Sequence, residues 1–298
     1  MNYPLVAKLA ASHQLVGVGE STHGTHEFFD FKSQLFKKLT EHGFNVLLLE
    51  DSPGVCSQIN DYIKSARGNI DQLMTGLYSV WRTKELKQLI VWLKDNYKQC
   101  PVELVGFDIF QSADNLKVRD ELMAKNIFNY VKANPKSKVF IWAHNVHVKS
   151  VSHKDGEPMG KFLRKWFGRD YFAIGQFFGV GSFSATIIDE KNPDWLNRKL
   201  SVVSVNSIPS DFLEHRLNEI DEKPYYLSNI GMAAFKYLDK TYRARSLGWG
   251  LVPNQVDSIV ERLNPVKDFD IITYFPSAMH SQPLKQYIIH NSLEFLSQ

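Results

Sequence analysis

The sequence predicts an α/β fold in which helices flank a mostly parallel β-sheet. Four apolar runs without polar alternation lie in the first half of the 298-residue chain, and such runs are typical of strands buried on both faces. Segments with helical spacing separate the runs, and strands that alternate with helices form parallel sheets through right-handed crossovers. The composition, with 44% apolar and 22% charged residues, is ordinary for a globular protein with a large core.

The first apolar run predicts a strand over 14–19, and the apolar spacing after it predicts a helix over 25–41. His42 and Gly43 form a typical helix stop. The loop between strand and helix has the sequence GESTHGTHE over 19–27. We therefore expect the loop to hold functional side chains, and the candidates are Glu20, Thr22, His23, His26 and Glu27.

The second run, 45–49, ends in the carboxylates of Glu50 and Asp51. The residues 54–99 that follow have helical spacing, and Thr83 is a good N-cap for the second helix of this stretch. No strand pattern occurs within the stretch. The sequence therefore predicts a helical insertion after the second strand, placed where it can cover the site as a cap.

The third and fourth runs also predict apolar strands that end in polar residues. The third run, 102–108, ends in Asp108 and precedes a predicted helix over 112–133. The fourth run begins at residue 138 and ends in His144 and His147.

The pattern is less regular after residue 170. Apolar and aromatic runs predict strands over 171–178 and 182–188, and the glycines between them are compatible with a hairpin, so antiparallel strands are expected in this part. Further strands are predicted over 200–205 and 269–274, and helices over 208–218 and 284–296. The absence of repeats and linkers favours a single domain over 1–298, with 54–99 as its insertion.

Charge and cysteine content argue against several classes of protein. The net charge is +3 and the pI about 8.6, and no basic stripe indicates binding to nucleic acid. Cys56 and Cys100 match no zinc or redox spacing, which favours free thiols in a reducing compartment. No secretory signal and no window of ~18 apolar residues is visible. We expect a cytoplasmic protein without membrane contact.

The polar ends of the four predicted strands should meet. In a parallel sheet all carboxyl ends lie at one edge, and ligands of open α/β sheets bind in the crevice outside that edge. A ligand bound in this crevice would then contact residues from four separate stretches of the chain. The side chains delivered to one cleft would be Glu20, His23, Glu50, Asp51, Asp108, His144 and His147.

Several kinds of chemistry lack their sequence signals. The chain has no G-x-S-x-G elbow, no P-loop, no G-x-G-x-x-G between a strand and a helix, and no H-E-x-x-H. Histidines and carboxylates remain, and they allow two interpretations. In one, a histidine oriented by a carboxylate activates water as a general base. In the other, His23/His26 and His144/His147 bind a metal ion with help from a carboxylate.

Five ordered motifs resemble those of the erythromycin esterase family. They are GESTHG at 19–24, LLLE at 47–50, WRTKE at 81–85, GFD at 106–108 and WAHNVH at 142–147. The resemblance covers residues 14–180 with specific motifs and the remainder more loosely.

The resemblance implies metal-independent hydrolysis of a carboxylic ester, which for macrolide-resistance members is the lactone of the antibiotic. Carried over to this sequence, His23 would be the base that activates water, without a covalent intermediate or a cofactor. Glu20 and Glu50 would orient or polarise the reacting groups, and His144 and His147 would assist at the carbonyl group of the ester.

The resemblance also implies a set of substrate-binding residues. Lys32 stands where the family has an arginine in the first helix, and lysine lacks the planar fork of guanidinium. The other expected contacts are Tyr78, Trp81, Asp108 and Asn145. A distant likeness of the family fold to iron- and haem-binding proteins leaves a non-enzymatic haem- or metal-binding protein as a further alternative.

Overall fold

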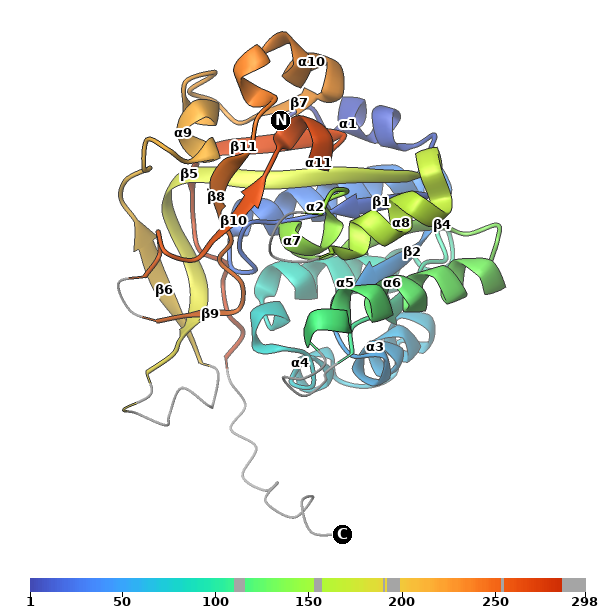
Figure 1. The fold of residues 1–298 in the computed structure, drawn as a ribbon. Coiled ribbons are helices and arrows are strands. Elements are labelled where there is room, and N and C mark those ends of the chain that lie inside the picture. Colours follow the sequence, from blue (N-terminus) through green and yellow to red (C-terminus); the bar gives the residue numbers. More distant parts are fainter. Residues whose placement is uncertain (110–115, 153–156, 190, 192–198, 253–254, 286–298) are drawn as a thin grey trace.

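The computed structural model describes residues 1–109, 116–152, 157–189, 191, 199–252 and 255–285. Its centre is a nine-stranded sheet with the order β3-β2-β4-β1-β5-β11-β7, in which β6 and β9 also pair with β5 (Figure 1). A separate two-stranded sheet pairs β8 with β10. The strands are β1 Leu15–Val18, β2 Phe44–Leu49, β3 Glu103–Gly106, β4 Lys138–Trp142, β5 Tyr171–Ile187, β6 Leu200–Val205, β7 Tyr225–Ser228, β8 Tyr242–Arg245, β9 Gly250–Leu251, β10 Val260–Leu263 and β11 Ile271–Ala278.

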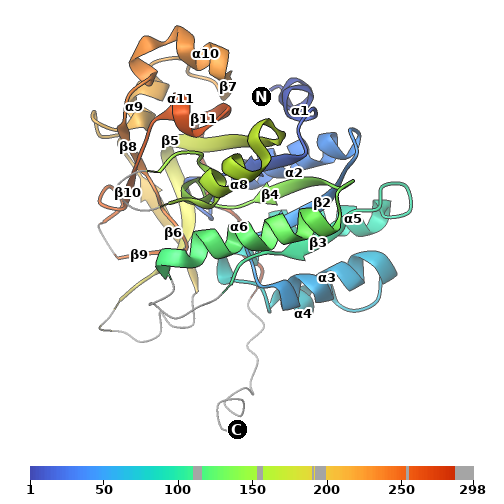
Figure 2. The ribbon, with the colours of Figure 1, turned by 45° about the vertical axis from the view of Figure 1, so that its right-hand side comes forward.

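Helices cover both faces of the sheet (Figure 2), and the strands contribute alternate side chains to two hydrophobic clusters. In β2, Leu47 and Leu49 pack with α1, α2, α3 and α5, whereas Val46 and Leu48 pack with α6 and α8. This two-sided burial explains the unbroken apolar runs of the sequence. The helices are α1 Tyr3–Ala10, α2 His26–Thr40, α3 Pro53–Ser65, α4 Ile70–Met74, η1 Ser79–Trp81, α5 Lys84–Asn96, α6 Leu116–Ala133, α7 Asn145–Val148, α8 Met159–Phe167, η3 Gly168–Asp170, α9 Leu213–Asn218, α10 Asn229–Ala234, η5 Lys236–Leu238 and α11 Pro265–Asp268.

The predicted fold class is confirmed. β1 lies between β4 and β5 and runs parallel to both, and β2 runs parallel to β3 and β4. The four strands predicted in the first half therefore point the same way, and their carboxyl ends share one edge of the sheet. Antiparallel pairing occurs in the C-terminal part, where β6 pairs with β5 and β7 with β11.

The stretch between β2 and β3 is helical, as its sequence predicts. Thr83 caps α5, because its hydroxyl accepts a hydrogen bond from the backbone N–H of Leu86. α3 and α5 pack in the hydrophobic cluster on one face of the sheet and so contribute to the core. η1 and the preceding Tyr78 reach the carboxyl edge, so this short part of the insertion borders the site.

The hairpin expected at residues 179–181 is wrong, because Tyr171–Ile187 forms one continuous strand, β5. Each half of β5 has its own partners: the first half pairs with β1, and the second half pairs with β6. Gly181 lies where the partners change and has a φ of +125°, a conformation that favours glycine. The strand thus continues through the glycines where a turn was expected.

One predicted helix differs in extent, and two others lie wholly or partly outside the described residues. The helix expected over 208–218 is shorter, because α9 spans only Leu213–Asn218. The helix expected over 284–296 lies almost entirely outside the described residues, as does the start of the one expected over 112–133. Among the helices that the structure describes, none is both long and apolar enough to cross a membrane.

A buried polar contact links α9 to the end of β8. Glu214 and Arg245 have no exposed surface, and Glu214 Oε1 accepts a 2.9 Å hydrogen bond from the backbone N–H of Arg245. Arg245 also donates from Nη1 to the carbonyl oxygen of Gly179 at 2.8 Å. Burial raises the pKa of Glu214 to about 7, although the Arg245 charge opposes the shift.

Glu214→Gln should therefore change the pH dependence of stability. Because the folded-state pKa of Glu214 lies above its ordinary value of 4.5, the folded protein keeps a proton that the unfolded chain releases, and this contribution is lost as pH rises through about 7. Glutamine cannot ionise, so the variant should gain up to about 3 kcal/mol relative to wild type between about pH 5 and pH 8.5.

Thermal unfolding at the two pH values measures this gain. The matched control is Glu222→Gln, which changes an exposed carboxylate in the same region. A stability difference between Glu214→Gln and wild type that is the same at both pH values would contradict the prediction.

Candidate active site

The ends of the first four predicted strands meet in one cleft of about 440 Å³. The loop after β1 supplies His23, the end of β2 supplies Glu50, and β4 leads into His144 and His147. The ring centroids of His23 and His144 are 5.1 Å apart. Residues far apart in the sequence thus line one cavity, and the full set is His23, Glu50, Tyr78, Ser79, Val80, Trp81, Asp108, Ile109, Arg119, His144, Val146, His147, Ser246, Gly248 and Trp249.

The loop after β1 forms a carboxylate–imidazole pair. His23 Nδ1 lies 2.7 Å from Glu20 Oε1, and both side chains are buried. The other carboxylate oxygen, Glu20 Oε2, accepts a hydrogen bond from Lys32 Nζ at 2.8 Å. Because Glu20 occupies Nδ1, the nitrogen of His23 that remains available to the cleft is Nε2.

A close approach to β5 holds the loop in place. The carbonyl oxygen of Gly24 accepts main-chain hydrogen bonds from the N–H groups of Ser184 and Ser281. A Cβ atom at Gly24 would lie 1.8 Å from the carbonyl oxygen of Ser184, so only glycine fits here. Gly24 of the GESTHG motif therefore permits the close backbone contact that positions the loop with His23.

His144 is a neutral imidazole at the N-terminus of α7. Its Nδ1 accepts a hydrogen bond from the backbone N–H of Val146 at 3.3 Å, which places the proton of the neutral ring on Nε2. Burial lowers the pKa of His144 well below its ordinary value, and the neighbouring His23 and His147 reinforce the shift. Nε2 has no partner of hydrogen-bonding geometry among the described residues.

His147 has the opposite protonation state. Its Nδ1 lies 2.8 Å from Asp120 Oδ1, and its Nε2 lies 3.1 Å from Glu50 Oε1. Burial favours the neutral ring, but Asp120 and Glu50 outweigh it and raise the pKa of His147 to about 10. The raised pKa favours a cationic His147 at neutral pH, although Arg119 Nη1 lies 3.2 Å from the same Nε2, so His147 is a poor candidate for the base.

Glu50, at the end of β2, contacts the end of β4 and helix α6. Its Oε2 accepts from the backbone N–H of His144 at 2.9 Å, and its Oε1 accepts from Arg119 Nη2 at 3.0 Å. Burial alone would raise the pKa of Glu50, yet the positive charges of His147 and Arg119 hold it well below its usual range. Glu50 is therefore a permanent carboxylate whose oxygens are both occupied.

Arg119 and Asp120 are site residues that could not be predicted from the polar ends of the strands. Both lie in α6, and Arg119 holds Asp108 with two hydrogen bonds, from Nε at 2.9 Å and from Nη2 at 2.8 Å. The sequence signal available was one Arg-Asp pair in a helix rich in charged residues, which a solvated helix face explains equally well.

Two predicted substrate contacts border the cleft next to the base. Trp81 donates from Nε1 to the carbonyl oxygen of Glu50 at 2.9 Å, and its ring meets His23 edge-on, with centroids 4.9 Å apart. The backbone N–H of Tyr78 is held by Asp51 Oδ2 at 2.7 Å. Asp108, a third predicted contact, also lines the cleft, in its pair with Arg119.

Other candidates lie behind the cleft or away from it. Lys32 and Asn145 have no exposed surface, and the Asn145 amide bonds to the backbone of Gln176. His26 lies outside the cleft, with its Nδ1 2.8 Å from Glu85 Oε1. The four histidines of the metal interpretation are thus not gathered in one place. Within the ranges that the structure describes, no group of three or more His, Cys, Asp or Glu residues is arranged to hold a metal ion.

Comparison with known proteins gives a family match. The model of the erythromycin esterase family matches residues 39–117 and 110–278. These stretches include Glu50, His144 and His147, while Glu20 and His23 precede them. A Bacillus subtilis protein named as a hydrolase, YbfO, is 33% identical over 116 residues, which are 36% of this chain and 24% of that protein. The chain thus matches about a quarter of the length of that relative.

Solved structures show the same fold at low sequence identity. A Bacillus cereus protein has a TM-score of 0.72 at 17% identity, covering 96% of this chain and 100% of that one. A succinoglycan biosynthesis protein has a TM-score of 0.71 at 20% identity, covering 93% and 91%. A mutant of the erythromycin esterase EreC in its open conformation has a TM-score of 0.69 at 17% identity, covering 93% of each chain.

Proposed function

This chain belongs to the erythromycin esterase family, and from that premise we propose that it hydrolyses carboxylic esters or lactones, with His23 as the base that activates water. The family supports a hydrolase of the esterase type. The finer assignment depends on one observation, the 2.7 Å contact between Glu20 Oε1 and His23 Nδ1 at the wall of the cleft.

The proposed step begins with a water molecule beside His23 Nε2. The carboxylate of Glu20 holds the proton of the ring on Nδ1, so the Nε2 lone pair can accept a proton from water. The hydroxide equivalent adds to the ester carbonyl carbon. The proton then passes from Nε2 to the leaving alkoxide oxygen, which yields a carboxylic acid and an alcohol without a covalent enzyme intermediate.

His144 supplies the donor for the oxyanion in this proposal, once the bound substrate displaces the packing that buries its Nε2. Its ring is neutral, carries its proton on Nε2 and lies 5.1 Å from the ring of His23, centroid to centroid. A neutral imidazole at a helix N-terminus can polarise a carbonyl without giving up its proton. Glu50 and the cationic His147 fix the position of His144 through its backbone and through their own ion pair.

Lys32 and Asn145 act as positioning residues in this proposal, because neither has exposed surface with which to contact a substrate. Lys32 orients the Glu20 carboxylate from behind and is itself held by the carbonyl oxygen of Ala143 at 3.0 Å. Trp81 also has no exposed surface, so in this proposal it positions His23 by ring contact. The substrate would instead contact Tyr78 and Asp108, with Val146 and Trp249 as further apolar walls.

Lys32→Arg should extend activity to higher pH. Burial lowers the pKa of Lys32 to about 8, against the raising effect of Glu20. As pH rises through about 8, Lys32 loses its charge, and the buried Glu20 carboxylate loses the cation that stabilises it. Turnover of wild type should therefore fall on the alkaline side of pH 8. Arginine stays protonated at all accessible pH values, so the variant should keep its rate there.

Rates from about pH 6 to pH 10 for wild type and Lys32→Arg measure this difference. Lys37→Arg, a change on the same helix α2, is the control, because Lys37 lies outside the cleft. If the rates of wild type and Lys32→Arg fell equally at alkaline pH, Lys32 would not be the charge partner of Glu20.

The experiment that tests the proposed function is a hydrolysis screen of wild type with aryl esters, simple lactones and macrolides. It is run with and without a chelator on protein purified without added metal. We expect hydrolysis of at least one class at a rate that the chelator leaves unchanged. Failure with every ester and lactone would overturn the proposal, and activity lost on chelation and restored by one metal would return the metal interpretation.

A further inference from the structure

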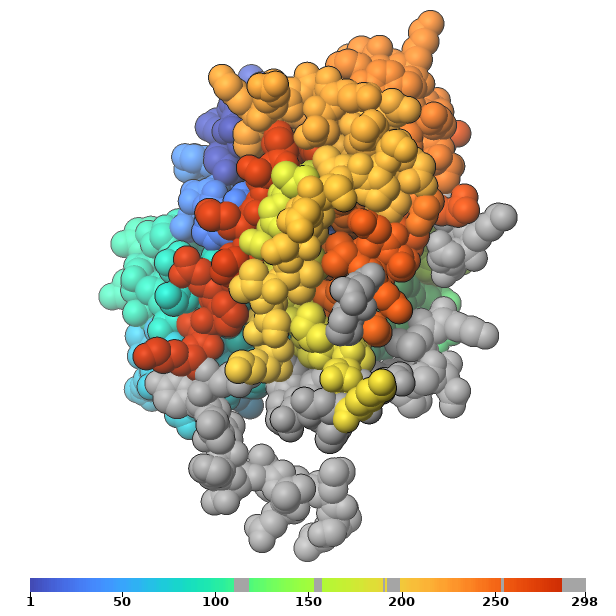
Figure 3. All heavy atoms as spheres, turned by 90° about the vertical axis from the view of Figure 1, so that its left-hand side faces the viewer, coloured from blue at the N-terminus to red at the C-terminus, as the bar shows by residue number. Residues whose placement is uncertain are grey.

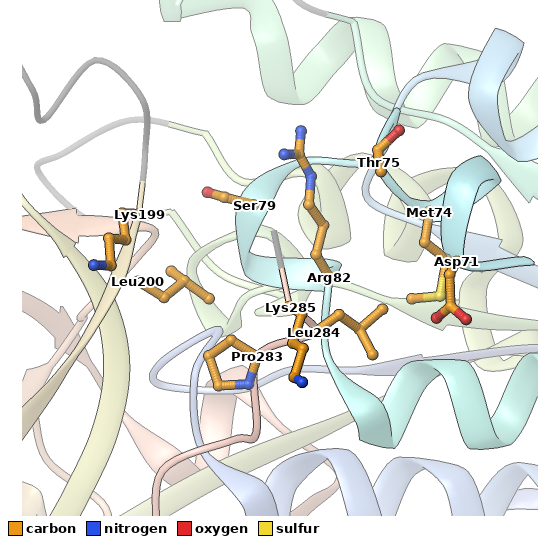
Figure 4. Close-up of a pocket in the computed structure, with 10 residues that line it drawn as sticks. All are labelled: Asp71, Met74, Thr75, Ser79, Arg82, Lys199, Leu200, Pro283, Leu284 and Lys285. Atoms are coloured by element: carbon orange, nitrogen blue, oxygen red, sulfur yellow. The ribbon is translucent and has the colours of Figure 1, made fainter. Parts of the chain in front are cut away.

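A second cavity, drawn in Figure 4, is lined by residues from the stretches 71–82, 199–200 and 283–285. Its volume is about 330 Å³, and Ser79 of η1 lines both this second cavity and the catalytic cleft. Trp81, in the same short helix, contacts the ring of His23. The second cavity and the catalytic cleft therefore share part of η1 as a wall.

Three segments that are distant in sequence build the second cavity: the stretch from α4 to Arg82, the start of β6, and residues 283–285. Residues 283–285 are fixed against Arg82, because the N–H of Leu284 donates to the Arg82 carbonyl oxygen at 2.8 Å. Figure 3 shows these C-terminal residues in red between the cyan helical insertion and the gold strand β6. The second cavity is thus a product of tertiary packing.

The wall of the second cavity is positively charged. Arg82, Lys199 and Lys285 border it from three sides in Figure 4. Asp71 is the one carboxylate among the described residues that line it, and its charge is matched by Lys87 Nζ at 2.6 Å. The charge of Arg82 also acts on Asp51, so the attraction for an anionic ligand depends on Lys199 and Lys285. Two lysines at the rim of one cavity favour an anionic group inside it, since a cavity lined by one sign of charge concentrates the opposite sign.

The rest of the wall is apolar. Met74, Leu200, Pro283 and Leu284 supply hydrocarbon surface between the cationic groups. Such a combination suits a ligand that has an apolar chain and a charged end. A small inorganic anion would leave this apolar surface in contact with water.

We propose that the second cavity binds the anionic end of an ester substrate whose carbonyl carbon lies beside His23. The substrate class is an ester or lactone that carries a carboxylate or a similar anion on an apolar chain, long enough to pass η1. This inference depends on the proposed function and adds the substrate class to it. The cationic wall selects the substrate, and the Glu20–His23 pair performs the hydrolysis.

The test compares 4-nitrophenyl esters of straight-chain acids of about six to ten carbon atoms, with and without a terminal carboxylate. The variant is Lys199→Gln/Lys285→Gln, which removes two exposed charges from the second cavity. Wild type should prefer the carboxylate esters, and the preference in kcat/KM should fall about threefold to tenfold in the variant, mostly through KM. Added salt should reduce the preference of wild type in the same way.

The matched control is Lys8→Gln/Lys240→Gln, which removes two exposed charges that line neither cavity. It should leave the preference unchanged. An equal preference in wild type and Lys199→Gln/Lys285→Gln, or a wild-type preference for the neutral esters, would overturn the inference while the hydrolase function stands.

A binding measurement separates this inference from the proposed function. Nonanedioate is titrated by calorimetry into His23→Ala and into the same variant with both lysines replaced by glutamine. Binding that weakens when the lysines are lost supports the anionic site even if no ester is hydrolysed, which would overturn only the function. Binding of equal strength in both proteins, or no binding, overturns the anionic site.

Discussion

His23→Ala is expected to lower kcat/KM about a thousandfold for any ester that the protein hydrolyses, within the ~10²–10⁴-fold range of general acid–base catalysis. Alanine removes the nitrogen that accepts the proton of water, and the neighbouring histidines cannot replace it. His147 is held as a cation between Asp120 and Glu50, and His144 uses its Nδ1 lone pair at the N-terminus of α7. Initial rates on a substrate found in the screen measure the loss.

The control for this prediction is His26→Ala. His26 lies three residues away in the sequence, but its ring is 36% exposed and pairs with Glu85 outside the cleft. The control should keep its rate within about twofold, because surface changes seldom exceed ~0.5 kcal/mol. If His23→Ala turned over substrate nearly as well as wild type, His23 could not be the base.

Glu20→Gln should lower turnover by about a hundredfold to a thousandfold while the protein stays folded. The carboxylate fixes the proton of His23 on Nδ1 and stabilises the imidazolium that forms when Nε2 accepts a proton. A glutamine amide can present an N–H to Nδ1, which would place the ring proton on Nε2 and remove the base. Loss of the correct tautomer is known to be costly in carboxylate–histidine catalysis.

The fold should tolerate Glu20→Gln because Lys32 can lose its charge. With Glu20 neutral, Lys32 would be a buried cation without its partner, and its lowered pKa of about 8 allows it to release the proton. The charge-balanced Glu20→Gln/Lys32→Met variant checks this explanation by circular dichroism and thermal unfolding. A folded Glu20→Gln protein that keeps a third or more of the wild-type rate would show that the carboxylate does not orient the base.

Much of the fold could be predicted because its signals are local. The start of α5 at Thr83 and the bounds of β1, β2 and β4 follow from cap chemistry and from unbroken apolar runs. The continuity of β5 could not be predicted in this way. Glycines at 179–181 resemble a turn, and only pairing with β6 and β11 shows that the strand continues.

Local sequence signals likewise predicted only part of the candidate site. Residues at strand ends were predictable, since parallel strands deliver their carboxyl ends to one edge. Arg119 and Asp120 were not, because they lie on α6 and reach the site only through the packing of that helix against the sheet. The second cavity has no sequence signal at all, since residues 71–82, 199–200 and 283–285 meet only in the folded chain.

The alternation of strands and helices, and the sheet edge where the polar strand ends gather, follow from the sequence alone, because apolar spacing and capping act between near neighbours. Which of those side chains face the cleft depends on the packing of the whole chain. This packing placed His23 against Glu20 and turned His26 toward Glu85, and it buried Lys32 behind the site. The physical reason is that each of these outcomes depends on partners and burial supplied by other elements, which no short stretch of sequence contains.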